Sequence, residues 1–182
     1  TARGDATLEK SFFILGKAAT IPDLNLEMRP IAPGSFQMGS ANGDSKERPV
    51  TRVTLTQGFW LGATEVTQAQ WSAIMGTSPA NFKGANLPVE QVSWTEAMEF
   101  CRKLNDRERA AGRLPAGYEY TLPTEAQWEY AGRAGTTGEY HGPLGEGPGT
   151  KLQLTRSALA GAVDRTPKAH CGIYPGRRPG RE

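Results

Sequence analysis

The chain has 182 residues, the length of one domain or of one domain with a tail, which excludes a large multidomain enzyme. Hydrophobic residues make up 37% and charged residues 22%, so neither full disorder nor a collagen-like fibre fits. The formal net charge is +2, but residues 151–182 hold 7 Lys and Arg against 2 Asp and Glu, so the basic character belongs to the tail. Nucleic-acid binding is not expected, because residues 141–182 hold a single aromatic residue, Tyr174.

Neither a membrane span nor a disulfide framework is expected. The longest apolar run, Phe12–Leu15, is far shorter than the ~18 residues of a membrane helix. Cys101 and Cys171 lack zinc-ligand spacing and leave the redox compartment open. Thr1 is not Met and no signal peptide follows it, so we expect a processed end or the end of a fragment. A secreted or periplasmic protein that has lost its signal peptide is consistent with this start.

The first part of the chain predicts short strands and turns. Residues 1–25 carry little pattern and are assigned to an N-terminal extension, with a turn at Ile21–Asp23. Two strands are expected at 26–32 and 35–39, joined by a turn at Pro33-Gly34. Two more are expected at 50–56 and 59–61, with a turn at Gln57-Gly58. The polar residues 40–49 predict an exposed loop between these pairs.

Three helix starts follow, each marked by a capping box, in which Ser or Thr and a Glu or Gln three residues later exchange hydrogen bonds. The boxes are Thr67–Gln70, Ser93–Glu96 and Thr124–Gln127. Gly76 and Gly132 are expected to end the first and third helices. Apolar residues recur at helical spacing after each box: Trp71, Ile74 and Met75, then Ala97, Phe100, Cys101 and Leu104, then Trp128 and Ala131.

Together these elements predict a compact α+β domain with short helices and strands and much irregular backbone. All four Trp residues lie between positions 60 and 128, and we expect their side chains to build the core. The domain is assigned to residues 26–144. Residues 145–182 form a Gly- and Pro-rich basic tail, in which 152–163 predicts at most one weak element and 175–182 an unfolded end.

Paired carboxylates are the first candidates for chemistry. Glu96 and Glu99 lie three residues apart, and Glu125 and Glu129 four apart, so each pair could bind a cation or act as acid and base. We favour a structural interpretation, because first-turn carboxylates complement the helix dipole and surface helices are normally charged. Glu65, just before the first capping box, is interpreted in the same way, as a residue that holds a turn.

Histidines and cysteines offer no clearer site. His141 and His170 are isolated, so nucleophilic catalysis is not expected. Cys171 follows His170 directly, but adjacent side chains rarely face each other, and Cys101 lies on an apolar helix face where a buried thiol is the usual role. The glycines between 132 and 149 match no phosphate-binding loop. From the residues alone, no catalytic, cofactor-binding or metal-binding residue is assigned.

Longer strings point to a family. They run from Phe36–Ser40 through Phe59–Trp71 and Leu87–Trp94 to Leu122–Ala131, followed by Arg133. In order and spacing these strings, which cover about residues 28–140, resemble the formylglycine-generating enzyme family, also called sulfatase-modifying-factor domains. The resemblance implies a fold related to C-type lectins with little regular secondary structure. In this chain that fold would be incomplete at its C-terminus.

The resemblance also implies an activity, the oxidation of a cysteine in a client sulfatase to formylglycine with molecular oxygen and a copper ion held by two cysteines. Those cysteines lie late in the family domain, and neither Cys101 nor Cys171 matches them. The calcium-binding loops of the family fall in the same missing part. Position 132, where some members carry Cys, is Gly132. No copper or calcium is therefore expected in this chain.

After Leu144 the sequence departs from the family, and a truncated or frame-shifted coding sequence is the explanation that we favour. We expect a marginal fold with exposed apolar surface. Three functions stay open: a piece of an enzyme that oxidises a peptidyl cysteine, a non-catalytic lectin-like module that binds a protein, peptide or carbohydrate, and an inert remnant. The second is typical of many bacterial members that lack the cysteine pair.

Overall fold

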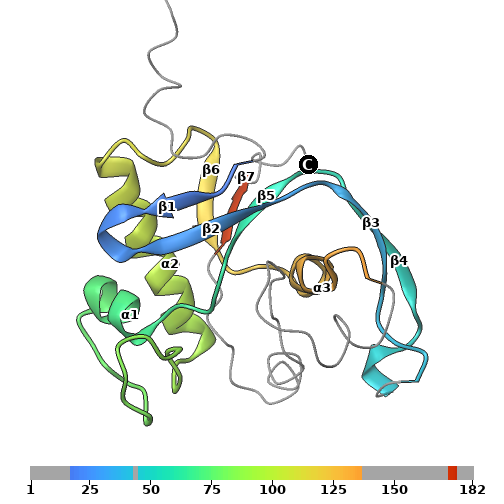
Figure 1. Ribbon diagram of the computed structural model, residues 1–182, viewed down its shortest axis with the longest axis horizontal. Coiled ribbons are helices and arrows are strands. Elements are labelled where there is room, and N and C mark those ends of the chain that lie inside the picture. The colour runs from blue at the N-terminus through green and yellow to red at the C-terminus, as the bar shows by residue number, and fades with distance from the viewer. Residues whose placement is uncertain (1–16, 43–44, 137–171, 176–182) are drawn as a thin grey trace, which may run out of the picture.

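The computed structural model describes residues 17–42, 45–136 and 172–175, and these form an α+β fold (Figure 1). An antiparallel sheet has the strand order β1-β2-β5-β7-β6. Its strands are β1 (Ala19–Ile21), β2 (Leu26–Ile31), β5 (Phe59–Gly62), β7 (Gly172–Pro175) and β6 (Tyr118–Thr121). A second sheet pairs β3 (Gly34–Met38) with β4 (Thr51–Leu55). The helices are α1 (Gln68–Met75), α2 (Trp94–Ala110) and α3 (Glu125–Arg133), with short 3-10 turns η1 (Pro22–Leu24) and η2 (Ser45–Glu47).

The two sheets share one bent ribbon. Ile31 pairs with Phe59 and Gly34 pairs with Leu55. Between these pairs, two residues that connect β2 to β3 lie opposite three residues that connect β4 to β5. An extra residue of this kind bends an antiparallel pair, and Figure 1 shows the ribbon arching over α3. The four predicted strands are present. The turns predicted at Pro33-Gly34 and Gln57-Gly58 are wrong as hairpin turns, because both dipeptides lie at this bend.

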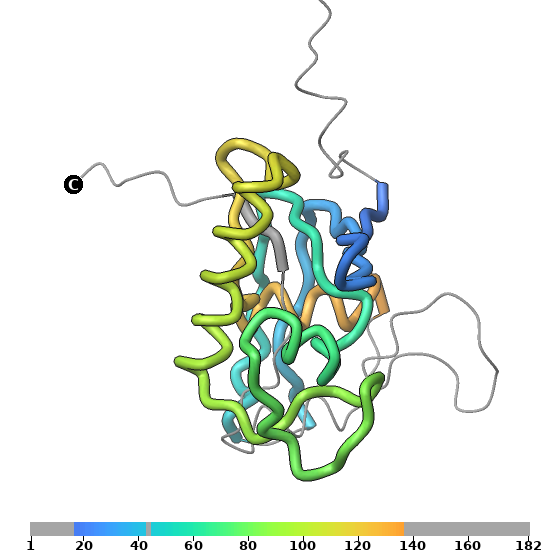
Figure 2. Tube along the Cα trace, turned by 90° about the vertical axis from the view of Figure 1, so that its left-hand side faces the viewer, coloured from blue at the N-terminus to red at the C-terminus, as the bar shows by residue number. Residues whose placement is uncertain are grey.

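All three predicted capping boxes are present at the starts of α1, α2 and α3. The first helix ends at Gly76, which has the left-handed φ of 74° expected of a helix-ending glycine. The third runs through Gly132 to Arg133, and Ala134 is its C-terminal cap. With 17 residues, α2 is longer than the short helix that we expected, and Figure 2 shows it running along one side of the molecule.

The main core lies where α1 and α2 meet the five-stranded sheet. Trp71 of α1 stacks on Phe100 of α2 with ring centroids 5.4 Å apart. The apolar face predicted for α2 is confirmed, because Ala97, Phe100, Cys101 and Leu104 are each at most 1% exposed. The second cluster consists of Phe59, Leu61 and Ala131, where β5 meets α3.

The expectation that all four Trp side chains build the core is wrong for Trp94. Trp60 and Trp71 are buried and Trp128 is half-buried, but Trp94 is 59% exposed. Trp94 is the first residue of α2, so it lies at the end of the helix. Helical periodicity identifies the apolar face but not how far the neighbouring layer extends along it.

The ordered structure reaches beyond both ends of the segment 26–144. Strand β1 and turn η1 lie within the predicted extension 1–25, and Ala19, Ile21 and Leu24 are buried. Strand β7 comes from the predicted tail 145–182 and lies between β5 and β6, so that segment is not wholly a tail. Neither β1 nor β7 shows the alternation of apolar and polar residues over four or more positions that predicts a strand.

Several sequence expectations lie outside the described residues: those on Phe12–Leu15, on residues 152–163, on His141, His170 and Cys171, and on residues 176–182. Pro175, which the sequence placed in the unfolded end, belongs to β7. Among the described residues no helix combines the length and apolarity needed to cross a membrane.

Candidate functional site

The first carboxylate pair of α2 does not converge on a common point. Glu96 accepts hydrogen bonds from the Ser93 backbone N–H at 2.8 Å and from its hydroxyl at 2.7 Å, and these bonds lower the pKa of Glu96. Glu99 instead pairs with Arg102, whose Nε and Nη2 donate at 2.7 and 2.6 Å and lower the pKa of Glu99. Each carboxylate is therefore ionised and held by a partner of its own helix.

The second predicted pair is also separated. Glu125 is exposed in the first turn of α3. Glu129 is mostly buried, with a side chain 11% exposed, and Arg133 donates to its Oε1 at 2.8 and 2.6 Å. The same carboxylate oxygen accepts the Gly39 N–H at 2.9 Å, while Arg133 donates to the Gly39 carbonyl at 2.8 Å. The ion pair of Glu129 and Arg133 therefore joins α3 to the end of β3.

Gly39 is suited to this contact by its backbone. Its φ is +92°, and a side chain there would overlap the carbonyl oxygen of Glu47. Only glycine adopts this conformation without strain. The pairing of Glu129 with Gly39, 90 residues away, could not be predicted from the sequence, although Arg133 at helical i+4 spacing was a visible partner.

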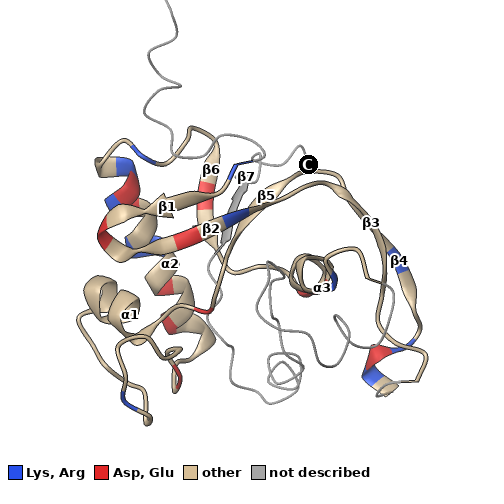
Figure 3. Cartoon of the chain, in the orientation of Figure 1, with Lys and Arg blue, Asp and Glu red and all other residues tan. Residues whose placement is uncertain are grey.

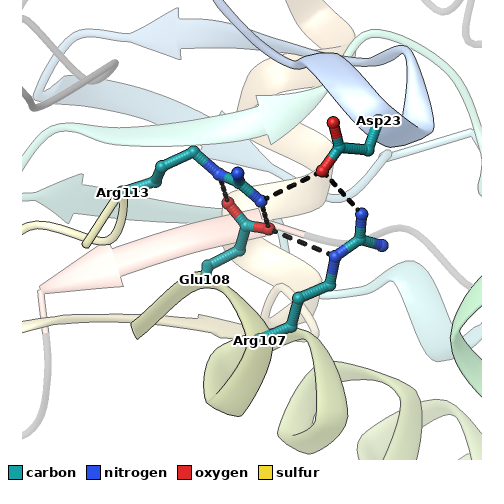
Figure 4. Close-up of polar contacts among 4 residues, drawn as sticks. All are labelled: Asp23, Arg107, Glu108 and Arg113. Carbon is teal, nitrogen blue, oxygen red and sulfur yellow. Dashed lines mark hydrogen bonds and ion pairs between the residues drawn. The ribbon is translucent and has the colours of Figure 1, made fainter. Parts of the chain in front are cut away.

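The most buried charged group among the described residues is Glu108, in the last turn of α2, with 1% exposure. Arg113 donates to both of its oxygens at 2.6 Å (Figure 4). This two-bond pair raises the pKa of Arg113. Arg107 approaches the same carboxylate at 3.8 Å and also binds Asp23 of η1 at 2.9 Å.

The four charges of this network, drawn in Figure 4, cancel. They join η1, near the start of the described chain, to the end of α2, and the Glu108 carbonyl accepts the backbone N–H groups of Arg113 and Leu114. This network was not predicted from the sequence. The visible signal was that Glu108 continues, at i+4 from Leu104, the apolar stripe of α2, where a polar residue needs a buried partner.

Buried amides make similar connections elsewhere. Asn105 donates to the Tyr120 carbonyl at 2.8 Å and accepts the Tyr120 N–H at 2.7 Å. It thereby satisfies both backbone groups of a residue on strand β6. Gln70 donates to the carbonyls of Leu24 and Asn25, each at 3.3 Å, and so joins α1 to η1.

A third buried amide, Gln68, organises the loop of residues 76–93 between α1 and α2, which we call the α1–α2 loop. Its Nε2 donates to the carbonyls of Phe82 and Pro88 at 2.7 and 3.2 Å. Its Oε1 accepts the Gly84 N–H at 3.1 Å. The Glu90 carboxylate accepts the Phe82 N–H at 2.8 Å. Side chains thus fix the backbone of this loop from both ends.

This well-held loop exposes apolar side chains. Phe82 is 76% and Leu87 45% exposed. The loop lies at the end of the molecule opposite the connection between α2 and β6 (Figures 1 and 2). Figure 3 shows no charge on α1, and the sequence of the loop holds only Lys83 and Glu90 as charged residues. The α1–α2 loop is therefore the candidate binding surface.

The other residues considered as site candidates from the sequence do not lie on the α1–α2 loop. Cys101 is buried in the main core among apolar neighbours. Glu65 is half-buried between β5 and α1, and its carbonyl accepts the Thr64 hydroxyl at 3.1 Å. Within the described ranges, no group of three or more His, Cys, Asp or Glu side chains could hold a metal. A two-thiolate copper site does not fit the described residues, whose single cysteine is enclosed by the core.

Comparison with known proteins agrees with the family that the sequence resembles. Residues 18–162 match the family described as sulfatase-modifying factor enzyme 1-like domain. The chaperone protein LppX of Paenibacillus barcinonensis is 32% identical over 127 residues, which are 56% of this chain and 43% of that protein.

Two solved structures are similar in fold. PvdO from Pseudomonas aeruginosa has a TM-score of 0.61 at 20% identity, over 76% of this chain and 59% of that one. Variable protein 1 of Treponema denticola has a TM-score of 0.56 at 25% identity, over 70% and 59%. The chain thus spans less than two thirds of each of these relatives. Since the family match covers well over half of the chain, the chain belongs to the formylglycine-generating enzyme, or sulfatase-modifying factor, family.

Proposed function

We propose that this chain is a polypeptide-binding module that holds a client protein on the α1–α2 loop. The observation that carries this proposal is the exposure of Phe82 and Leu87 on a loop fixed by buried Gln68. Single exposed apolar residues are normal on protein surfaces. Apolar side chains that gather on the surface mark interaction sites, and Phe82 and Leu87 belong to one loop whose backbone a buried amide holds.

The rigidity of the loop supports binding in energetic terms. A surface that is ordered before the partner arrives loses less conformational entropy on binding. Gln68 and Glu90 together make four hydrogen bonds to loop backbone groups. The loop is therefore held in one conformation by contacts that need no ligand.

The similarity to LppX supports a polypeptide as the ligand. That relative is named a chaperone, and chaperones act on other protein chains. This chain covers 43% of LppX, so the whole activity of that protein is not part of the inference.

The test measures binding of a fluorescently labelled, reduced and carboxymethylated α-lactalbumin by anisotropy. Burying a Phe side chain contributes about 1.5–3 kcal/mol. The substitution Phe82→Ser should therefore weaken binding roughly 10- to 150-fold, and Leu87→Ser should weaken it in the same direction. Val50→Ser is the matched control, because Val50 is 41% exposed but lies next to β4, outside the α1–α2 loop.

Equal affinity of Phe82→Ser and the unaltered chain would reject the loop as the binding surface. Binding to a glycan array, without binding to the unfolded polypeptide, would favour a carbohydrate ligand instead. Circular dichroism of each variant checks that the substitution has not changed the fold.

The family description favours a second candidate, oxidation of a client cysteine. The described residues do not fit the two-cysteine copper site of that chemistry. We therefore expect no aldehyde when the chain is incubated with copper and a peptide containing Cys-Xaa-Pro-Xaa-Arg. Aldehyde formation, detected by mass spectrometry, would make the chain an oxidase.

A further inference from the structure

Three of the four large apolar residues that are exposed in the described part of the chain lie between positions 82 and 94. They are Phe82, Leu87 and Trp94, and the fourth is Val50. Trp94 is the first residue of α2, directly after the α1–α2 loop, and it is 59% exposed. Trp side chains are highly buried on average, so an exposed Trp next to a loop with two more exposed apolar residues indicates a contact surface.

Hydrogen bonds hold the backbones of Phe82 and Leu87 together. The Nε2 of Gln68 donates both to the Phe82 carbonyl and to the carbonyl of Pro88, the residue after Leu87. The Leu87 N–H donates to the Gly84 carbonyl at 3.0 Å, and a Cβ on Gly84 would lie only 2.9 Å from the Leu87 side chain. Because Gly84 has no side chain, Leu87 can lie against the loop backbone. We call Phe82 and Leu87 the loop anchor.

Trp94 is held close to the loop anchor. The Glu90 carboxylate accepts the Phe82 N–H at 2.8 Å, and the chain from Glu90 to Trp94 can span at most about 13–14 Å between Cα atoms. Within that stretch Val92 is buried and Gln91 has the left-handed φ of 60°, so the path of the chain is fixed. Figure 2 shows α2 beginning at the end of the molecule where the α1–α2 loop lies. Trp94 and the loop anchor therefore belong to one end of the molecule.

The charges at this end already have partners within the fold. Lys83 donates to a loop carbonyl at 3.1 Å, and Glu90 accepts a loop N–H at 2.8 Å. Glu96 accepts two hydrogen bonds from Ser93 and offsets the positive end of the α2 dipole. Helix α1 carries no charged residue. The surface that a partner can cover is therefore apolar, and a charged side chain buried against it would lose hydration without gaining a matched ion pair.

We propose that Trp94 is a second anchor of the client-binding surface, so that the surface takes an extended, uncharged segment of an unfolded polypeptide with two bulky apolar side chains. This inference rests on the proposed function and adds the class of client segment to it. One apolar side chain covers the loop anchor and the other covers Trp94. An extended chain advances about 3.3 Å per residue, so a separation of up to about 13–14 Å corresponds to client side chains about four residues apart.

The test compares two fluorescently labelled peptides built from Gly, Ser and Asn. One carries two Phe residues four positions apart, and in the other the second Phe is replaced by Ser. Anisotropy gives the dissociation constant of each peptide for the full chain. Burial of the second Phe side chain should make the two-Phe peptide bind about 10-fold more tightly than the one-Phe peptide.

Substitution of the second anchor separates its role from that of the loop anchor. Trp94→Ser should weaken binding of the two-Phe peptide about 10-fold and change binding of the one-Phe peptide by no more than about 2-fold, since that peptide still has the loop anchor. Trp94→Phe keeps an apolar ring and should retain most of the affinity. Val50→Ser is the control for an exposed apolar residue elsewhere.

The charge preference is measured with two further peptides, in which Lys or Glu replaces the second Phe. Both should bind no more tightly than the one-Phe peptide. A Lys peptide that binds as tightly as the two-Phe peptide would show that Glu90 and Glu96 attract a cation, and this would overturn the uncharged class of client.

A second readout needs no substitution. Trp60 and Trp71 are buried and Trp128 is half-buried, so acrylamide should quench mainly the fluorescence of Trp94. Saturation with the two-Phe peptide should reduce this quenching. Unchanged quenching while the peptide is bound would contradict the proposal.

The outcomes distinguish this inference from the proposed function. If Trp94→Ser binds the two-Phe peptide as well as the unaltered chain does, and Phe82→Ser still weakens binding, Trp94 is not an anchor and the α1–α2 loop remains the binding surface. If Phe82→Ser has no effect either, the proposed function fails together with this inference.

Discussion

At the scale of single residues, buried polar side chains join segments that are far apart in the sequence. Glu108, Asn105 and Gln68 are each below 9% exposed. Glu108 is hydrogen-bonded to an arginine, and the two amides are hydrogen-bonded to backbone groups. A fold with short strands has few ladder hydrogen bonds between segments. These side chains supply connections of the same kind, and a buried polar group that loses its partner costs more than the bond itself was worth.

Glu108→Gln should destabilise the chain strongly. The carboxylate is 1% exposed and its partner Arg113 has a side chain 19% exposed, so the substitution leaves a largely buried positive charge without its main partner. Breaking such a pair costs about 3 kcal/mol. Urea unfolding followed by tryptophan fluorescence measures the loss. Glu99→Gln is the control on the same helix, since its pair with Arg102 is exposed; equal midpoint shifts in the two variants would refute the buried role of Glu108.

The first turns of α2 predict how stability depends on pH. Hydrogen bonds from Ser93 lower the folded-state pKa of Glu96 below its value in the unfolded chain. The ionised carboxylate therefore stabilises the fold above the unfolded pKa of about 4.3, and this contribution is lost as the pH falls through the lower folded pKa. In thermal melts, Glu96→Gln should lower Tm at pH 7, and the difference from the unaltered chain should shrink toward pH 3. A constant difference across that range would contradict the assignment.

At the scale of elements, local sequence signals predicted the helix starts, but the sequence did not predict how strands pair over long distances. Each helix start depends on a side chain and a backbone group three residues apart, as at Thr67 and Gln70, so the sequence contains the whole motif. The bend of the ribbon depends on which of two strands carries the extra residue, which only the pairing of Ile31 with Phe59 reveals. Turn-forming residues such as Pro33-Gly34 are equally suited to a turn and to a bend.

The cap of α3 can be tested directly. Thr124 accepts the Gln127 N–H at 3.2 Å, and Gln127 accepts the Thr124 N–H at 2.9 Å. Thr124→Ala should cost about 1 kcal/mol, which corresponds to a Tm lower by roughly 2–4 °C. Thr95→Ala removes the same hydroxyl from the first turn of α2, where Ser93 and not Thr95 is the cap. An unchanged Tm for Thr124→Ala, measured by circular dichroism, would show that the box does not stabilise α3.

At the scale of the whole molecule, the family could be predicted from strings of residues, and the candidate surface could not. The family match over residues 18–162 confirms the resemblance and extends beyond residues 28–140 on both sides. The α1–α2 loop gave no signal, because the exposure of Phe82 depends on where Gln68 holds the backbone. Strand β7 could not be predicted for a similar reason, because its four residues form a strand through pairing with β5 and β6, which are distant in the sequence.

The contribution of β7 to the fold decides whether the C-terminal segment belongs to this domain. Ile173→Pro removes a backbone N–H from a strand with neighbours on both sides, a position that proline disfavours. Each backbone group left unpaired beside the core costs about 1–3 kcal/mol, so Tm should fall and a hydrophobic dye should bind the uncovered edge of β5. Ile173→Val keeps the N–H and is the matched control. If the two variants melt alike without dye binding, the domain closes without β7, and residues 172–175 have no structural role in the sheet. If only the proline variant is destabilised, residues 172–175 complete the sheet and a frame-shifted, functionless tail becomes the weaker explanation.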